Sequence, residues 1–199
     1  MQKYIERGSS IQAPTWLLPS LCAHHQSVPS NPGISQPYPD LMSQPRLSRK
    51  DFLSYLKAFN TRDYKFQHSF YAQNVTLTLP DPAVPPLKGP SAIAQHYDGV
   101  HSLAEETVVP MVVMNDGDKV FLVMEVYFKY LKDTNEGVHS QKVKKDDVFK
   151  VQVWALYDID EEGKMLTIRC NLWEEKLFGQ VDVEPLIAES RSRAQEDLR

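Results

Sequence analysis

Three residues near the middle of the sequence carry side chains that could move a proton: Tyr55, Asp81 and His96. A phenol on an apolar helix face needs a hydrogen-bond partner, and in a cavity a substrate oxygen that gains negative charge can be that partner. A carboxylate between two prolines can be held at the mouth of a pocket, where partial loss of water makes it a better base. An imidazole is the usual proton shuttle near neutral pH. Together these residue types indicate general acid–base chemistry on a small molecule.

Each of these residues also has a structural explanation. Tyr55 could be a core tyrosine whose hydroxyl bonds to a neighbour, and an aspartate beside proline is common in turns. A lone histidine on an apolar face is often a core or rim residue, so for His96 we expect contact with a ligand before catalysis. His101, near the end of the same helix, is expected to face solvent.

The sequence gives little support for a metal or a cofactor. His24 and His25 lie in a proline-rich segment, and no cysteine–histidine spacing is typical of a zinc site. There is no glycine-rich phosphate loop and no G-x-S-x-G motif. We therefore expect neither a metal nor a cofactor.

The elements that must position these residues follow from the spacing of apolar side chains. Ser48, with Asp51 three residues later, is an N-cap signal. A helix is predicted after it, because four apolar positions recur at helical spacing. These positions are Phe52, Tyr55, Leu56 and Phe59. The stretch DYKFQHSFYA predicts a second short helix, NVTLTL a strand and PDPAVPP a loop that carries Asp81.

Ser91 is expected to cap a third helix with His96 and Tyr97 on one face. After Leu103 the apolar period changes from 3.6 to 2. Four strands are predicted, at residues 107–114, 119–130, 148–158 and 165–174. The turns NDGD and DEEGK predict hairpins, whereas the polar connection 132–147 is long enough to close over a cavity. The expected fold is an α+β cone, in which a curved antiparallel sheet packs on about three helices.

This order of elements resembles the NTF2-like superfamily and, within it, the SnoaL-like proteins. The resemblance covers about residues 47–178. It is carried by AFN-x-x-D (58–63), FYAQNVTLTL (70–79), LKGPSAI-x-x-HY (87–97) and GKMLTIRCNLWEE (163–175). This fold hosts isomerases, cyclases, dehydratases, epoxide hydrolases and binding modules without catalysis.

The stretch YLKAFNTRD is also similar to the Y-x-A-A-L-N-A-G-D stretch of bacterial ketosteroid isomerases. That similarity implies an oxyanion-stabilising role for Tyr55. It implies a general-base role for Asp81, which lies about two residues later than the isomerase aspartate. The place of the third isomerase group, a protonated aspartate, is taken by Trp154 or Ala155.

The cavity walls are expected to come from Phe59, Tyr97, Met111 and Val113, which would exclude water. Two placements remain open for the polar set that includes Glu125 and Arg169. In the first, these residues lie on the outer, convex face of the sheet and form a homodimer interface. In the second, Glu125 and Arg169 line the cavity as an acid–base or anchoring pair, as strand-borne Asp and Arg do in related epoxide hydrolases. The uninterrupted apolar set on the opposite face favours the first.

Residues 1–46 differ from the rest of the 199-residue chain. Seven of the 14 prolines fall there, which predicts a disordered extension before a SnoaL-like domain at 47–179. Residues 180–199 are expected to form a C-terminal tail that can be helical. The net charge of -4 without a basic stripe argues against nucleic acid as a partner.

Cysteine use and hydropathy indicate a cytoplasmic protein. Cys22 and Cys170 lie far apart and predict no disulfide framework. No apolar run is long enough to span a membrane, and the N-terminus lacks a secretory pattern. The leading hypothesis is a cofactor-independent isomerase, cyclase or dehydratase that acts on a hydrophobic carbonyl compound. The alternative is a non-catalytic module that binds a ligand or forms a dimeric protein-interaction domain.

Overall fold

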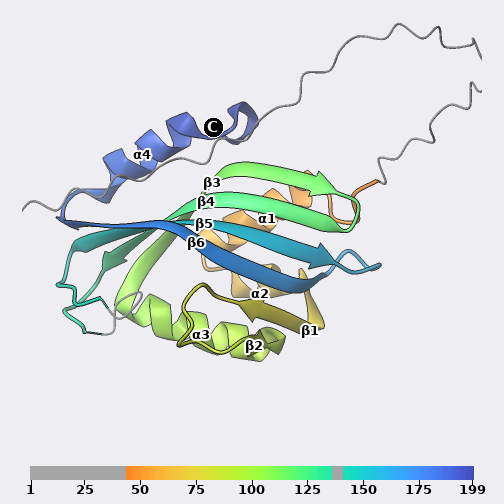
Figure 1. Ribbon diagram of the computed structural model, residues 1–199, viewed down its shortest axis with the longest axis horizontal. Helices are drawn as coiled ribbons and strands as arrows, with labels where there is room; N and C mark the ends of the chain where they lie inside the picture. The colour runs from red at the N-terminus through yellow and green to blue at the C-terminus, as the bar shows by residue number, and fades with distance from the viewer. Residues whose placement is uncertain (1–43, 136–140) are drawn as a thin grey trace, which may run out of the picture. The chain divides into compact units, whose positions relative to one another are not determined.

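A curved sheet of six strands, open at both edges, carries the domain (Figure 1). The computed structural model describes residues 44–135 and 141–199. In chain order, the elements are α1 (Arg49–Asn60), α2 (Tyr64–His68), β1 (Tyr71–Thr78), β2 (Leu87–Lys88), α3 (Gly89–Leu103), β3 (Ala104–Asp116), β4 (Lys119–Tyr130), β5 (Asp147–Ile159), β6 (Met165–Gln180), α4 (Val183–Arg193) and the short 3-10 helix η2 (Glu196–Leu198).

The strands follow the order β2-β1-β6-β5-β4-β3. Strands β3 to β6 form the antiparallel meander that the hairpin signals predict. Strand β1 pairs with β6 in parallel, so the sheet is mixed rather than wholly antiparallel. The two-residue strand β2, which pairs with β1, was not predicted.

Helix α1 begins and ends as its sequence predicts. The Ser48 hydroxyl accepts a hydrogen bond from the Asp51 N–H at 3.1 Å and caps the helix. At the other end, the Asn60 side chain bonds to both the N–H and the carbonyl of Val108, each at 2.8 Å. Asp63 then caps α2 through the Phe66 N–H. The AFN-x-x-D motif therefore fixes the corner between α1, α2 and β3.

Helix α3 begins three positions earlier than predicted. Lys88, not Ser91, is its N-cap residue, and Pro90 lies in its first turn. Proline is tolerated there because the first N–H groups of a helix have no partner within it. Gly89, the residue before Pro90, has a φ of 79°, a left-handed conformation that favours glycine.

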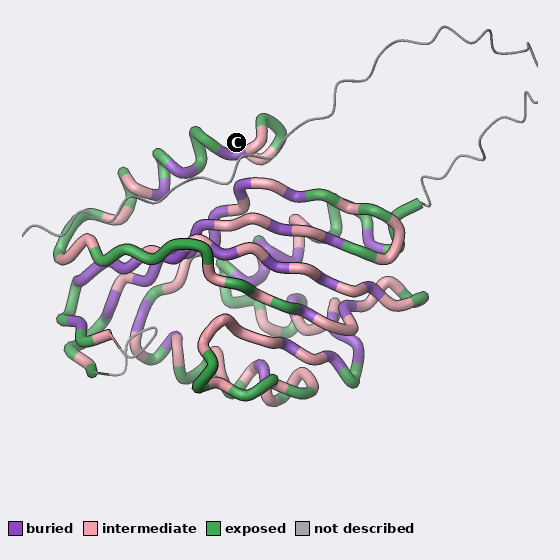
Figure 2. The backbone as a smooth tube through the Cα atoms, viewed as in Figure 1, coloured by how far each residue is buried: buried purple, intermediate pink, exposed green. Residues whose placement is uncertain are grey.

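The concave face of the sheet holds the main core, which includes Phe52, Tyr55 and Phe59 of α1 and Ile93 of α3. As expected from alternation, the uninterrupted apolar sides of β4 and β5 face these helices. Figure 2 shows the buried residues recurring along these strands.

A fourth helix, α4, covers part of the convex face near β3 and β4 (Figure 1). Its packing buries Glu125, whose carboxylate accepts hydrogen bonds from Ser190, from Arg193 at 2.9 Å and from Lys150 at 3.3 Å. Burial acts to raise the pKa of Glu125, but the bonds from Ser190 and Arg193 outweigh it, and the pKa is lowered. The sequence prediction did not place a helix over this face.

Two predicted segments lie wholly or partly outside the described residues. They are the N-terminal extension, of which residues 1–43 are not described, and the 132–147 connection, of which residues 136–140 are not described. Within the residues that are described, no helix is long and apolar enough to cross a membrane.

Candidate functional site

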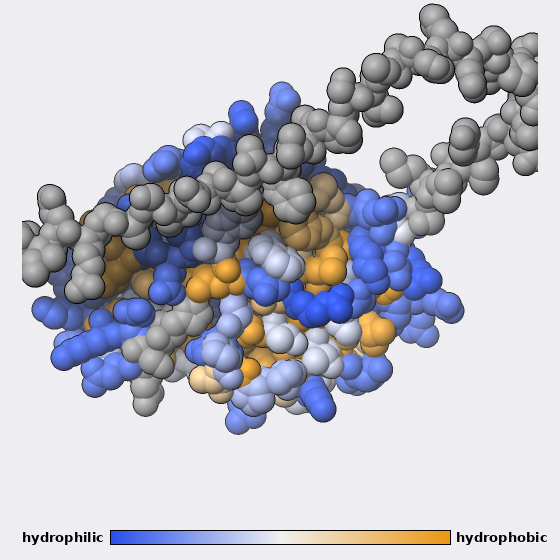
Figure 3. All heavy atoms as spheres, viewed as in Figure 1, coloured by the Kyte–Doolittle hydropathy of each residue, from blue (hydrophilic) through white to orange (hydrophobic). Residues whose placement is uncertain are grey.

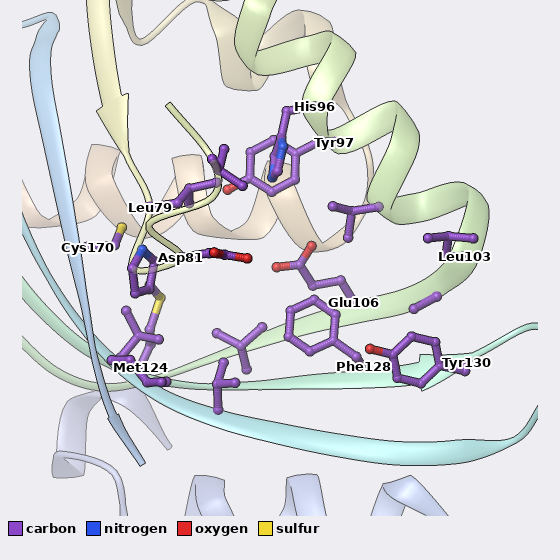
Figure 4. Close-up of a pocket in the computed structure, with 18 of the residues that line it drawn as sticks. Leu79, Asp81, His96, Tyr97, Leu103, Glu106, Met124, Phe128, Tyr130 and Cys170 are labelled. Atoms are coloured by element: carbon purple, nitrogen blue, oxygen red, sulfur yellow. The ribbon is translucent and has the colours of Figure 1, made fainter. Parts of the chain in front are cut away.

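A cavity of about 390 Å³ opens between the concave face of the sheet, helix α3 and the loop after β1. Its size lies within the range of small-molecule sites. The walls are mostly apolar and include Leu79, Val100, Met124, Val126, Phe128 and Val153. Figure 4 shows the polar side chains that enter this space.

The central polar feature is a chain of hydrogen bonds from Glu106 through His101 to Tyr64. The Glu106 Oε2 lies 3.1 Å from the Nε2 of His101, and the His101 Nδ1 lies 2.5 Å from the Tyr64 hydroxyl. The side chains of His101 and Glu106 are only 5% and 7% exposed. If Tyr64 donates to Nδ1, the Nε2–H of His101 donates to the carboxylate, so the imidazole fixes the direction of the Glu106 side chain.

Local structure explains how these groups meet. His101 lies in the last turn of α3 and Glu106 in the first residues of β3, and the strand follows the helix without a loop. The His101 ring is held by neighbouring aromatic rings, with centroids 5.7 Å from Tyr97 and 5.9 Å from Phe59. The expectation that His101 faces solvent is therefore wrong.

Glu106 was not identified from the sequence, although a signal was present. Ala104, Glu106 and Val108 share one side of β3, and the other two are buried. A lone carboxylate among inward-facing apolar positions is a candidate site residue, because burial of an unpaired charge is costly.

Burial raises the pKa of Glu106, and the hydrogen bond from His101 opposes that rise only in part. Only Oε2 is engaged: within residues 44–135 and 141–199, no hydrogen bond reaches Oε1. A carboxylate with raised basicity and a free oxygen towards an apolar cavity can accept a proton from a bound compound.

His96 and Tyr97 also line the cavity, side by side on α3 (Figure 4). Burial lowers the pKa of His96, and nearby His101 lowers it further, so the imidazole is neutral near pH 7. Burial raises the pKa of Tyr97 well above its ordinary value, so its hydroxyl keeps its proton. The Tyr97 hydroxyl has no hydrogen-bond partner in the described part of the chain, and it can donate to a ligand.

Asp81 lines the cavity from the loop after β1, and its carboxylate points inward (Figure 4). It also has the turn role that its neighbouring prolines suggest, because Oδ1 accepts the Ala83 N–H at 2.8 Å. Cys170 lies on the wall as well, and burial raises its pKa to about 12, which keeps the thiol protonated.

Tyr55, by contrast, lies in the core behind the cavity and does not line it. Its hydroxyl is 3.3 Å from that of Tyr71, which also accepts a hydrogen bond from Gln67 at 2.8 Å. Phe59 packs edge-on against Tyr97 with ring centroids 5.0 Å apart, and it supports the wall without lining it.

The remaining predicted wall residues lie elsewhere. Met111 faces α4 on the convex side, as Val109 does, whereas the bulge after Pro110 in β3 places Val113 in the inner core, outside the cavity. Glu125 is sealed under α4, and Arg169 is exposed and pairs with Asp158 at 2.9 Å. Neither charged residue lines the cavity, so the outward placement of this polar set is the one that the structure shows.

No group of three His, Cys, Asp or Glu side chains within the described residues is arranged to hold a metal ion.

The sequence of the chain matches a known domain family. The family model of the SnoaL-like domain matches residues 52–168, more than half of the chain. No curated protein matches the sequence.

Solved structures that share the fold include the following three. A protein from Xanthomonas campestris pv. campestris, described as a candidate polyketide cyclase, is 20% identical with a TM-score of 0.53 over 71% of this chain and 94% of its own. The epoxide hydrolase/cyclase-like enzyme SalBIII, described for pyran ring formation in salinomycin, is 16% identical with a TM-score of 0.52 over 65% and 95%. RV0760c from Mycobacterium tuberculosis, solved with estradiol-17beta-hemisuccinate, is 14% identical with a TM-score of 0.50 over 66% and 95%. At these identities the likeness shows the fold alone.

Proposed function

The chain belongs to the SnoaL-like domain family. We propose that it is a small-molecule enzyme that transfers protons without a cofactor. The reaction class is isomerisation, cyclisation or dehydration of a hydrophobic carbonyl compound. One observation carries the proposal: the Glu106 carboxylate faces an apolar cavity while His101 holds its other oxygen. The cyclase and epoxide hydrolase/cyclase-like proteins of the same fold support the reaction class.

Glu106 acts as the general base. Its Oε1 takes a proton from the carbon next to the carbonyl group, and the electron pair of the broken C–H bond forms a C=C bond as the carbonyl oxygen gains negative charge. Tyr97, rather than Tyr55, donates a hydrogen bond to that oxygen, because Tyr97 lines the cavity and its hydroxyl is available. His101 is a positioning residue that acts through Glu106.

Asp81 and His96 are proposed as assisting groups. Both line the cavity. His96 lies next to Tyr97, and its neutral imidazole can accept a proton and return it. The wall residues Leu79, Val126 and Phe128 exclude water, which strengthens each of these polar interactions.

The proposal is tested by exchange of α-protons with solvent. The protein is incubated in D₂O with a panel of hydrophobic ketones, and deuterium uptake is followed by NMR. We expect exchange above the buffer rate for at least one ketone, loss of that exchange in Glu106→Gln, and no loss in Glu105→Gln. Glu105 is the matched control because it is exposed on the opposite side of the same strand. Ketones that bind without any catalysed exchange would contradict the proposal.

A non-catalytic binding module is the second candidate. The observation that favours it is the placement of Tyr55, since the residue aligned with the isomerase donor is bonded to Tyr71 and does not reach the cavity. The steroid ester bound to RV0760c is consistent with a binding role for this fold. Binding without exchange in the same assay identifies this case.

The homodimer expected from the sequence is also proposed here. Trp173 and Met114 are 76% and 53% exposed, and Phe121 and Trp154 pack together on the convex face with ring centroids 6.0 Å apart. Figure 3 shows hydrophobic residues reaching the surface in the middle of the viewed face. We expect the wild type to sediment as a dimer and Trp154→Lys to sediment as a monomer.

The cytoplasmic location stays a prediction that cell fractionation would test.

A further inference from the structure

Among the described residues, the two charged groups that line the cavity are both acids. Asp81 and Glu106 reach it from the loop after β1 and from β3, and none of the described lysines or arginines lines it. His96, the remaining titratable nitrogen on the wall, has a lowered pKa because of its burial and of nearby His101, and it adds no positive charge near neutral pH. A ligand in this space therefore meets negative charge, and the part of the wall that the structure describes supplies no compensating cation.

Both carboxylates are fixed in place by hydrogen bonds. His101 donates to Oε2 of Glu106 from behind, which leaves the other oxygen towards the cavity. The Ala83 N–H donates to Oδ1 of Asp81 at 2.8 Å. In Figure 4 both side chains point into the space between α3 and the sheet. Neither acid can turn away to relieve repulsion without breaking its hydrogen bond.

The apolar walls strengthen this effect. Charges interact more strongly where water is excluded, and a like charge brought against a partly buried carboxylate lowers affinity by about tenfold to a hundredfold. An uncharged compound meets no such repulsion, and its carbonyl oxygen can accept from Tyr97.

We infer that the cavity selects uncharged apolar compounds and rejects anionic forms of the same skeleton, such as carboxylates, sulfates and phosphates. This inference rests on the proposed function in one respect, because it takes the same cavity as the substrate site. It names the substrate class: a neutral ketone or ester rather than a free acid or a phosphorylated conjugate. The reaction that supplies the substrate must accordingly deliver it without a charged carrier group.

The test compares two ligands of nearly equal size and shape. Binding of acetylnaphthalene, a neutral ketone, and of naphthoate, its carboxylate analogue, to the full chain is measured by calorimetry at pH 7.5. We expect naphthoate to bind at least tenfold more weakly. The double variant Asp81→Asn, Glu106→Gln should bring the two affinities within about threefold, whereas Glu105→Gln should leave the difference unchanged.

Equal affinity of the two ligands for the wild type overturns the inference, as does a difference that survives in the double variant. Binding of neither ligand overturns the assignment of the cavity as a site. Failure of the proposed function looks different: the neutral ketone binds selectively, but its α-protons do not exchange. Exchange of naphthalene ketones together with tight naphthoate binding leaves the proposed function standing and overturns the charge selection.

Discussion

Replacement of Glu106 by glutamine separates the proposed chemistry from the structural role of this side chain. The glutamine amide oxygen can still accept the hydrogen bond that the carboxylate takes from His101 at 3.1 Å. It cannot take up a proton. A positioned general base contributes about 10²- to 10⁴-fold in rate, so the exchange rate should fall by that factor, or about 3–5 kcal/mol in activation free energy.

The same variant should not lose stability at neutral pH. Burial raises the pKa of Glu106 in the folded chain above its ordinary value of 4.5. A group of this kind contributes stability that is fully present below its unfolded pKa and is lost as the pH rises through the folded pKa. Glutamine carries no charge at any of these pH values. The free energy of unfolding of Glu106→Gln relative to the wild type should therefore increase as the pH rises from about 4 to about 8.

Urea unfolding across that pH range measures the stability, and α-proton exchange in D₂O measures the rate. Glu105→Gln is the control for both, since Glu105 is exposed beside Glu106. A variant that keeps the exchange rate would refute the role of Glu106 as base. A variant that is less stable than the wild type by the same amount at every pH would show that Glu106 is a structural residue.

Three further predictions follow from other parts of the structure. Tyr97→Phe should lower the exchange rate about 10²- to 10³-fold, whereas Tyr55→Phe should change it far less, because Tyr97 lines the cavity and Tyr55 does not; the reverse order would restore the isomerase-like assignment. Val153→Phe should fill the cavity and abolish ketone binding in calorimetry while the chain stays folded at a cost of about 1–3 kcal/mol, and unchanged affinity would place the ligand elsewhere. Glu125→Gln should lower the free energy of unfolding at neutral pH by about 1.5–3 kcal/mol, because Glu125 accepts charged hydrogen bonds from Arg193 and Lys150. The lowered pKa of Glu125 means that this difference is present above about pH 4.5 and disappears as the pH falls through the folded pKa, so a difference that persists in acid would contradict the assignment.

The parts of the fold that depend on local pattern were predictable from the sequence. The Ser48 cap, the buried face of α1 and the bounds of β4 at Lys119 and Tyr130 follow from spacing and capping alone. The bulge at Met111 was not predictable in this way, because one extra residue in β3 reverses the side on which the following side chains lie.

The candidate site was only partly predictable for a related reason. His96, Tyr97 and Asp81 were identified by residue type and position, and all three line the cavity. The pair His101 and Glu106 depends on a contact across the corner between α3 and β3, which periodicity within either element does not reveal. For Tyr55 the sequence motif identified the residue but not its contacts, because its hydroxyl is bonded to that of Tyr71.

The most direct test of the account is the titration of the Glu106 carboxyl group, followed by ¹³C NMR with and without a neutral ketone and assigned through Glu106→Gln. We expect an apparent pKa above the ordinary value of 4.5 and a change in the carboxyl signal when the ketone binds. A Glu106 that titrates at or below 4.5, with a signal that does not respond to the ketone, would contradict the claim that this carboxylate is the base of the cavity.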